Sequence, residues 1–180
     1  LSWTPASAGN RKTWTWSGWI KRNTISTAEK TFFGSGNDFS NFTALAWIND
    51  NIFFQNYTGG SQVTASTTAV YRDPSAWYHV VLSVDTTQGT AADRLKLYVN
   101  GVQESGFTGS SISLNQEFWI NSTYHHSLGA RAAASFDSFA DLYFADTYFI
   151  DGQALSASDF GETKNGVWVA KNYAGTFGTN

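Results

Sequence analysis

The sequence predicts an all-β domain built as a two-sheet antiparallel β-sandwich, with at most one or two short helical turns. Residues that favour strands, namely Thr, Val, Ile and the aromatic residues, outnumber the residues that favour helices. The chain has 16 glycines and only 2 prolines, so Gly, Asn, Asp and Ser are expected to form most of its turns. Short strands separated by such polar turns are typical of sandwiches and barrels.

The elements follow in order along the chain. Residues 13–20 begin with alternating polar and aromatic side chains, which predicts a half-buried strand with Trp14 and Trp16 on one face. Residues 44–48 and 52–57 read as two strands of a hairpin, because the three residues between them tolerate left-handed backbone angles.

The middle of the chain gives the clearest strand signals. Residues 77–85 alternate so that Tyr78, Val80, Leu82 and Val84 are expected to point into the core. Residues 94–102 alternate as well and contain Asn-Gly at 100–101, which predicts a hairpin turn. The polar residues 86–93 between these strands are predicted to form a surface loop.

The last part of the chain is expected to contain shorter elements. Short strands are predicted at 118–120 and 127–129. A further strand is predicted at 141–150, where odd and even positions are both mostly apolar, which indicates a central strand covered on both faces. The Ser-x-x-Asp pattern at 156–159 predicts a capped helical turn, and residues 166–170 a last strand.

The 180 residues are enough for one domain with a sizeable core, and no linker or low-complexity tract divides them. We therefore expect residues 1–180 to form a single domain. The chain contains no methionine, not even at position 1. Either its start was processed or it was cut from a longer polypeptide, and we expect a fragment.

The composition excludes several classes of function. The chain has no cysteine, which excludes disulfides, cysteine-based zinc sites and thiol nucleophiles. Its formal net charge is −3 and its 11 lysines and arginines are scattered, so nucleic acid is not an expected partner. No apolar run approaches the roughly 18 residues that a membrane-spanning helix needs, so membrane insertion is not expected either.

Five segments in order resemble the laminin-G-like jelly roll of the concanavalin A-like lectin/glucanase superfamily. They are residues 16–21, 77–81, 97–102, 128–131 and 144–155. The amino-acid sequence of residues 71–79 and 149–162 resembles more closely a subgroup found in structural or tail-fibre proteins of marine bacteriophages. The resemblance implies a sandwich with one concave sheet that binds glycans or protein ligands on its loops or concave face.

The residues do not support catalysis. The glucanase branch of the superfamily carries Glu-x-Asp-x-x-Glu on one strand, and none of Glu29, Glu104, Glu117 and Glu162 begins that pattern. A Gly-x-Ser-x-Gly nucleophile motif is also missing. We therefore expect a protein that is not an enzyme, with a glycoside hydrolase as the less favoured alternative.

No cofactor is predicted. His125 and His126 are adjacent, so on a strand they would point to opposite faces and could not share a metal ion. Related sandwiches hold Ca²⁺ through Asp, Asn and main-chain oxygens, and Asp50, Asp85 and Asp146 are possible donors. The alternative that these are ordinary turn residues is preferred.

Two loops combine aromatic rings with the amide, carboxyl and imidazole groups that bind sugar hydroxyls. One covers residues 47–51 and the other residues 119–126, with Arg131 just beyond. The candidate ligand-binding residues are Trp47, Asn49, Asp50, Asn121, Tyr124, His125, His126 and Arg131. Core packing is the alternative for Trp47 and Trp119, and it is preferred for Trp14, Trp16, Trp19 and Trp77. His79 is expected to pack beside the core or to bond across the sheet.

These observations together predict a non-catalytic, lectin-like module on a virion surface or another extracellular assembly. The expected partner is a cell-surface glycan, with other virion proteins and further copies of the chain as possible neighbours. The alternative is an assembly domain of a phage particle. A glycan site predicts partly exposed aromatic and polar side chains on a concave surface, whereas an assembly role predicts a flat apolar patch.

Overall fold

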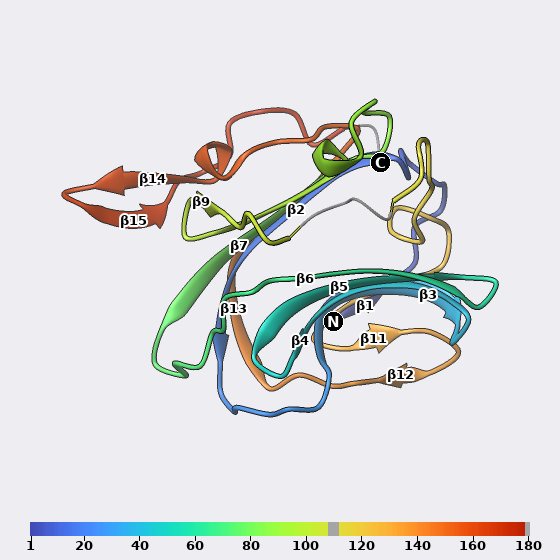
Figure 1. Ribbon diagram of the computed structural model, residues 1–180, viewed down its shortest axis with the longest axis horizontal. Helices are drawn as coiled ribbons and strands as arrows, with labels where there is room; N and C mark the ends of the chain where they lie inside the picture. The colour runs from blue at the N-terminus through green and yellow to red at the C-terminus, as the bar shows by residue number, and fades with distance from the viewer. Residues whose placement is uncertain (108–111, 179–180) are drawn as a thin grey trace.

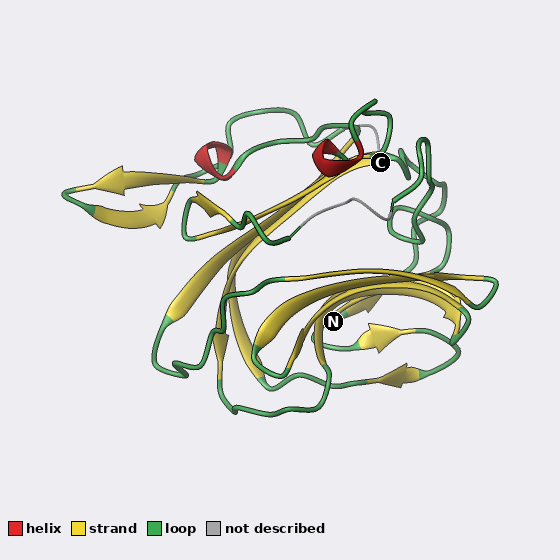
Figure 2. Ribbon diagram, viewed as in Figure 1, coloured by secondary structure: helices red, strands yellow, loops and turns green. Residues whose placement is uncertain are grey.

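The chain folds into two antiparallel sheets that face each other, as a computed structural model of residues 1–107 and 112–178 shows (Figure 1). The six-stranded sheet, called sheet A, has the order β1-β10-β3-β4-β5-β6, and the five-stranded sheet B has the order β13-β2-β7-β8-β9. Two short helical turns, η1 and η2, are the helical elements of the described residues (Figure 2). The predicted all-β sandwich is therefore confirmed.

The strands of sheet A are β1 (Ser2–Trp3), β3 (Lys30–Asp38), β4 (Asn41–Ile48), β5 (Asn51–Thr58), β6 (Ser61–Ser66) and β10 (His125–Leu128). Sheet B contains β2 (Thr13–Arg22), β7 (Trp77–Asp85), β8 (Leu95–Val99), β9 (Val102–Gln103) and β13 (Leu142–Asp151). Two hairpins lie outside the sheets: β11 (Arg131–Ala132) with β12 (Phe136–Asp137), and β14 (Gly161–Lys164) with β15 (Val167–Ala170). The helical turns are η1 (Ala91–Asp93) and η2 (Ala157–Asp159).

Aromatic side chains from both sheets fill the space between them. Trp16 of β2 lies 5.5 Å from both Phe32 and Phe33 of β3, measured between ring centroids. The four positions of β7 predicted to point inward, Tyr78, Val80, Leu82 and Val84, all belong to the same buried cluster. Burial of this apolar surface is the main stabilising contribution to a fold of this size.

Both predicted hairpin turns are present. Asn49 and Asp50 have φ of 51° and 67° between β4 and β5, and Asn100 and Gly101 have φ of 50° and 84° between β8 and β9. Two consecutive left-handed residues match the right-handed twist of the flanking strands, which is why Asn, Asp and Gly occupy these positions. The predicted turn at 156–159 is also confirmed, since the carboxylate of Asp159 accepts the backbone N–H of Ser156 at 2.9 Å.

The prediction of a central strand at 141–150 is wrong. β13 pairs with β2 alone and forms an edge of sheet B. A bulge interrupts the pairing, because Ala145 lies opposite Trp19 while Tyr148 lies opposite Ser17. The bulge has one residue more than the opposing strand, so side chains that share a face before and after it fall at odd and at even positions. Apolar residues therefore occur at both, although the strand is not covered on both faces.

Two further expectations need correction. Residues 118–120 form a loop, in which Phe118 and Ile120 are buried although the backbone is not in a sheet. Trp77 is 40% exposed and Trp19 is partly exposed, so neither is a core residue, whereas Trp14 and Trp16 are completely buried as expected.

The strands of sheet A arch over the β11–β12 hairpin, which lies on the side away from sheet B (Figure 1). The hairpin approaches β3 closely, because a Cβ atom at Gly36 would lie 2.8 Å from the carbonyl oxygen of Ala132. Glycine at this position is therefore required for the hairpin to lie against the sheet. We call this side the outer face of sheet A. Within the described ranges, no helix is long and apolar enough to span a bilayer.

Candidate functional site

The two loops predicted to bind a ligand lie at opposite ends of β4. The Asn49–Asp50 turn follows its last residue, Ile48. The other loop contacts the start of the strand, where the backbone N–H of Trp119 donates to the Thr43 hydroxyl at 2.9 Å. The predicted residues therefore do not form one site.

The first loop is part of an ion-pair cluster that joins buried Arg22 and exposed Arg72 through Asp50. The Asp50 carboxylate accepts from Arg22 at 3.0 Å and from Arg72 at 3.1 Å. The guanidinium carbon of Arg22 lies 5.1 Å from the ring centroid of Trp47, which has no exposed surface. Trp47 cannot stack on a ligand from this position, so core packing is its role and Asp50 serves to neutralise Arg22. Asn49 is exposed in the turn.

In the second loop, His126 and Asn121 are buried and bond to each other. The backbone N–H of Asn121 donates to Nε2 of His126 at 2.8 Å, so the ring proton resides on Nδ1, which donates to the Tyr124 carbonyl at 2.9 Å. His126 is 2% exposed, and its burial lowers its pKa to about 4. The ring is therefore neutral, and both of its nitrogens are used to fix residues 121–124.

A pocket of about 350 Å³ adjoins these two side chains. It lies between the N-terminal segment and the sandwich, and Trp3, Pro5, His126 and Phe149 are among its lining residues. Trp3 covers His126 with a ring-centroid distance of 5.4 Å. Because His126 has no free hydrogen-bonding nitrogen, its ring offers this pocket no polar contact.

Tyr124 and His125 are exposed, as the sequence suggests, but they face different surroundings. Tyr124 packs against Trp119 with a ring-centroid distance of 5.3 Å. His125 pairs with Gly36 in β10 and β3, which places it on the outer face of sheet A, and its ring lies 6.2 Å from that of Phe136.

Arg131 lies at the centre of a network on the outer face of sheet A. Its Nε and Nη2 atoms donate to the two oxygens of Asp137 at 2.8 and 2.7 Å, and Nη1 donates to Glu29 at 3.2 Å. The bonds to Asp137 raise the pKa of the guanidinium further. The other oxygen of Glu29 accepts from Thr31 at 2.8 Å and from Gln55 at 2.9 Å. The two parallel bonds between Arg131 and Asp137 fix the orientation of the guanidinium and of the carboxylate.

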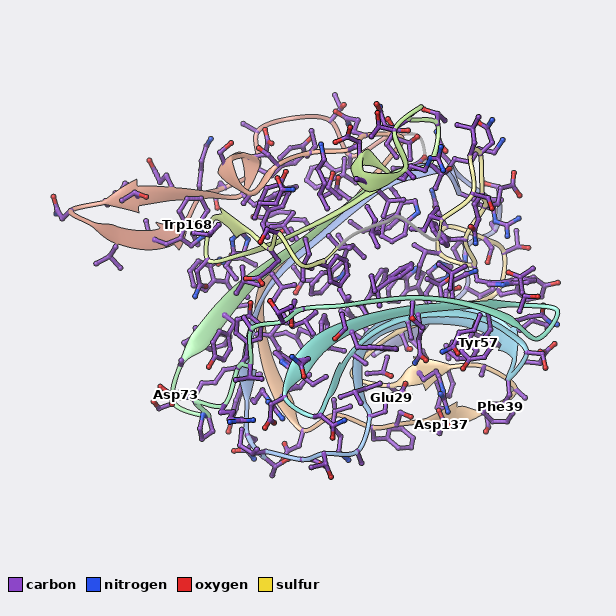
Figure 3. All side chains as sticks on the ribbon, viewed as in Figure 1. Glu29, Phe39, Tyr57, Asp73, Asp137 and Trp168 are labelled. Atoms are coloured by element: carbon purple, nitrogen blue, oxygen red, sulfur yellow. The ribbon has the colours of Figure 1, made fainter. Side chains whose placement is uncertain are left out.

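Aromatic rings surround this network. The Arg131 guanidinium carbon lies 5.0 Å from the Phe42 ring centroid and 5.7 Å from that of Phe39. Phe42 stacks on Tyr57 of the neighbouring strand with a centroid distance of 4.8 Å. Glu29, Phe39, Tyr57 and Asp137 gather beneath sheet A on the side of the hairpin (Figure 3).

The outer face is also where aromatic side chains remain accessible. Phe39 is 50% exposed and Phe136 is 41% exposed. Beside Phe136, a pocket of about 200 Å³ extends to Phe139 and Leu1. The arrangement offers flat rings next to charged groups of fixed direction, on the side over which the sheet arches.

Most of these residues were not predicted. They lie in or beside β3, β4, β5 and the β11–β12 hairpin, and of these strands only β4 and β5 are predicted from the sequence. The usable signal was Gly34-x-Gly36, since glycines at alternate positions of a strand mark the close approach of another backbone to one face.

The possible calcium donors do not converge. Asp50 is paired with two arginines, and Asp85 accepts from Thr87 at 2.6 Å and from Gln88. Over the part of the chain that the structure describes, no group of three His, Cys, Asp or Glu side chains is placed to hold a metal ion. Asp50 and Asp85, held by these bonds, do not fit a calcium site.

Residues 2–167 match the family described as the concanavalin A-like lectin/glucanases superfamily. The chain belongs to this superfamily. No curated protein sequence is significantly similar to the chain. The resemblance seen in the order of sequence segments is thereby confirmed at the level of the superfamily.

Solved structures of the concanavalin A-like fold are similar to the chain at low identity. Domain 4 of an extracellular arabinanase from Geobacillus stearothermophilus, solved with arabinotriose, superposes with a TM-score of 0.60 and 18% identity over 85% of this chain and 65% of that one. A carbohydrate-binding module of the Ruminococcus gnavus sialidase, solved with α2,3-sialyllactose, superposes with a TM-score of 0.55 and 16% identity. The match covers 88% of this chain and 95% of that one. The heptameric pentraxin of Limulus polyphemus superposes with a TM-score of 0.57 and 15% identity, over 85% of this chain and 70% of that one. At these identities the likeness establishes the fold.

Proposed function

We propose that the chain is a non-catalytic glycan-binding module whose ligand lies on the outer face of sheet A. The observation that carries the proposal is the Arg131 network on that face, beside the exposed rings of Phe39 and Phe136. Sugar recognition needs apolar rings to cover C–H surfaces and oriented polar groups to bond the hydroxyls. Both are present here within one surface.

The network retains unused hydrogen-bonding capacity. A guanidinium has five N–H donors, and the bonds of Arg131 to Asp137 and Glu29 use three of them. The carboxylate of Asp137 is partly exposed and has lone pairs beyond the two that Arg131 uses. A donor and an acceptor of fixed direction lie side by side, which suits the adjacent hydroxyls of a sugar ring.

The charge of the network favours a neutral sugar. One guanidinium is surrounded by two carboxylates, Glu29 and Asp137, and the chain as a whole carries a formal charge of −3. An anionic sugar would meet a locally negative surface. We therefore propose a neutral ligand, in contrast to the sialylated ligand of the Ruminococcus gnavus module.

Two relatives by fold support the proposal, since the arabinanase domain and the sialidase module were each solved with an oligosaccharide. The resemblance of residues 71–79 and 149–162 to phage structural proteins leads us to propose a position on a virion surface or another extracellular assembly. Further copies of the chain and other virion proteins would be neighbours there. Display in several copies would raise the overall affinity of a site that is weak on its own.

The experiment is an array of neutral and acidic glycans probed with the chain fused to a multimerising tag. We expect binding to neutral glycans that falls at least about tenfold in the Phe39→Ala and Phe136→Ala variants, since each removes about 1.4 kcal/mol of stacking. The matched control is Phe177→Ala, which removes a similarly exposed ring far along the chain. No binding above background, or equal binding by all variants, would refute the proposal.

Exposed rings on the outer face also fit an assembly contact, and this is the second candidate. Phe139 and Leu1 are highly exposed and border the same small pocket as Phe136. If the outer face packs against a neighbour, Phe139→Ala and Phe136→Ala will change the sedimentation of the full-length protein and leave the glycan array unaffected.

A further inference from the structure

A second aromatic pocket lies on sheet B, on the side away from sheet A. It has a volume of about 350 Å³, and three tryptophans line it: Trp19 of β2, Trp77 of β7 and Trp168 of β15. Trp168, which pairs with Thr163 in the projecting β14–β15 hairpin, lies far from the outer face of sheet A (Figure 3). The pocket is thus separate from the site proposed above.

The side chain of His79 holds two walls of the pocket in place. Trp19 stacks on His79 with a ring-centroid distance of 5.0 Å, and Nε1–H of Trp168 donates to Nδ1 of His79 at 3.0 Å. The other ring nitrogen of His79 bonds to the Ser17 hydroxyl at 3.0 Å. His79 therefore fixes two of the three tryptophans, so that little ordering is needed when a ligand binds.

Glycines allow Trp168 to reach this position. A Cβ atom at Gly101 would lie 2.7 Å from the Trp168 ring, and one at Gly161 would lie closer still. Both positions must therefore lack a side chain for the hairpin to bring its tryptophan over sheet B. The close approach links three separate elements, β15, β7 and the turn after β8, around one indole.

Asp146 adds a carboxylate to the pocket, and it is the one charged side chain among the lining residues. It lies in the bulge of β13 with φ of 45°, a backbone angle that Asp and Asn tolerate better than other residues with a side chain. In the described part of the chain, Asp146 takes part in no ion pair. Bulges often turn a side chain toward a site.

The lining selects among ligands. The other lining residues, Ala145, Val169 and Ala170, have apolar side chains, so the hydroxyls of a sugar would find few partners. A quaternary ammonium group needs none, because indole faces and a nearby carboxylate attract its charge. The cation–π contacts of the described residues involve Arg11, Arg22 and Arg131 with other rings, so none of them supplies a cation to this pocket.

We propose that Trp19, Trp77, Trp168 and Asp146 form an aromatic cage for a quaternary ammonium group of the choline type. The source of that group is either a free amine or the head group of a choline lipid. This inference does not depend on the glycan proposal, since the two sites lie on different sheets and share no residue.

The test is titration of the chain with choline, followed by indole N–H signals in NMR spectra, with 3,3-dimethylbutan-1-ol as the uncharged analogue of the same shape. We expect saturable shifts with choline and none with the alcohol. Sedimentation with phosphatidylcholine vesicles distinguishes a lipid source, and binding in either assay supports the proposal. Equal shifts with the alcohol, or no response in both assays, would overturn it.

Two variants locate the binding. Trp77→Ala is expected to weaken choline binding about five- to tenfold, and Asp146→Asn at least about threefold while preserving the backbone of the bulge. Tyr143→Ala is the matched control, because Tyr143 is an exposed aromatic residue of β13 outside the pocket. A loss in Tyr143→Ala equal to that in Trp77→Ala would also contradict the proposal.

Discussion

The guanidinium of Arg131 and the carboxylate of Asp137 are joined by two parallel hydrogen bonds, at 2.8 and 2.7 Å, on the outer face of sheet A. Both residues come from the β11–β12 hairpin, whose own pairing places Arg131 opposite Asp137. The hairpin therefore carries a preformed polar unit to the sheet, where Glu29 accepts a third bond. The orientation of the proposed sugar-binding groups follows from this local pairing.

Arg131→Lys is expected to abolish glycan binding while the protein remains folded. Lysine keeps the charge but cannot form the two-point bond to Asp137 or cover the Phe42 ring with a planar group. We expect the free energy of unfolding to fall by about 1–2 kcal/mol, measured by urea denaturation. The control is Lys164→Ala, which removes an exposed ion pair and should change stability by less than about 0.5 kcal/mol. Undiminished glycan binding by Arg131→Lys would contradict the assigned role.

Asp50→Ala is expected to destabilise the fold by about 3–5 kcal/mol and to leave the ligand specificity unchanged. The substitution leaves the completely buried guanidinium of Arg22 without its carboxylate partner. Arg72→Ala removes the exposed partner of the same carboxylate and should cost less than about 1 kcal/mol. Thermal or urea denaturation of the two variants checks the difference, and similar losses in both would show that Arg22 is not the residue that needs Asp50.

Stability is expected to decrease as the pH falls from about 6.5 to about 4. Burial lowers the pKa of both His79 and His126 to about 4, whereas an unfolded histidine has a pKa near 6.5. The unfolded chain therefore binds more protons in this range, so the stabilisation is complete above pH 6.5 and is lost as the pH falls through the folded-state value. The loss is on the order of 3 kcal/mol for each histidine.

Urea denaturation at several pH values measures this dependence. His126→Gln keeps polar groups at the site but removes the titration, so its stability should vary less between pH 7 and pH 4.5 than that of the original chain. A pH profile that His126→Gln leaves unchanged would show that this residue titrates normally in the folded state.

Trp16→Ala and Trp77→Ala are expected to differ strongly in stability although both residues lie in strands. Trp16 is completely buried and contacts Phe32 and Phe33, so its loss should cost about 3–5 kcal/mol. Trp77 is 40% exposed at the start of β7 and lies outside the core, so its loss should cost much less, about 1 kcal/mol. Denaturation curves for the two variants test this, and a large cost for Trp77→Ala would place that ring in the core instead.

The alternation of side chains predicted the two layers because it records which face of a strand is buried. It identified β2, β7 and β8, including the inward residues of β7, while turn residues located β4 and β5. It failed at β13, where the bulge after Ala145 changes the parity, and at residues 118–120, where apolar residues are buried without forming a sheet. Neither case can be recognised from apolar spacing, since both depend on what the neighbouring segment does.

The proposed site was harder to predict than the fold. Of the eight candidate residues, Arg131 and His125 lie on the outer face of sheet A, while His126 and Asn121 bond to each other in the interior. A polar residue in a loop looks the same in sequence whether it binds a ligand or satisfies a buried backbone group. Arg131 has two acidic partners, Glu29 and Asp137, which are 108 residues apart in the chain. They come together only when the strands have paired.

The most direct test of the glycan proposal is NMR mapping of a neutral oligosaccharide selected from the array, using assigned backbone and arginine Nε–H signals. Saturating ligand is expected to shift the Arg131 Nε–H signal together with the backbone signals of Phe39, Tyr57 and Phe136. Shifts confined to the Asn49–Asp50 turn or to the pocket beside His126, with Arg131 unaffected, would contradict it.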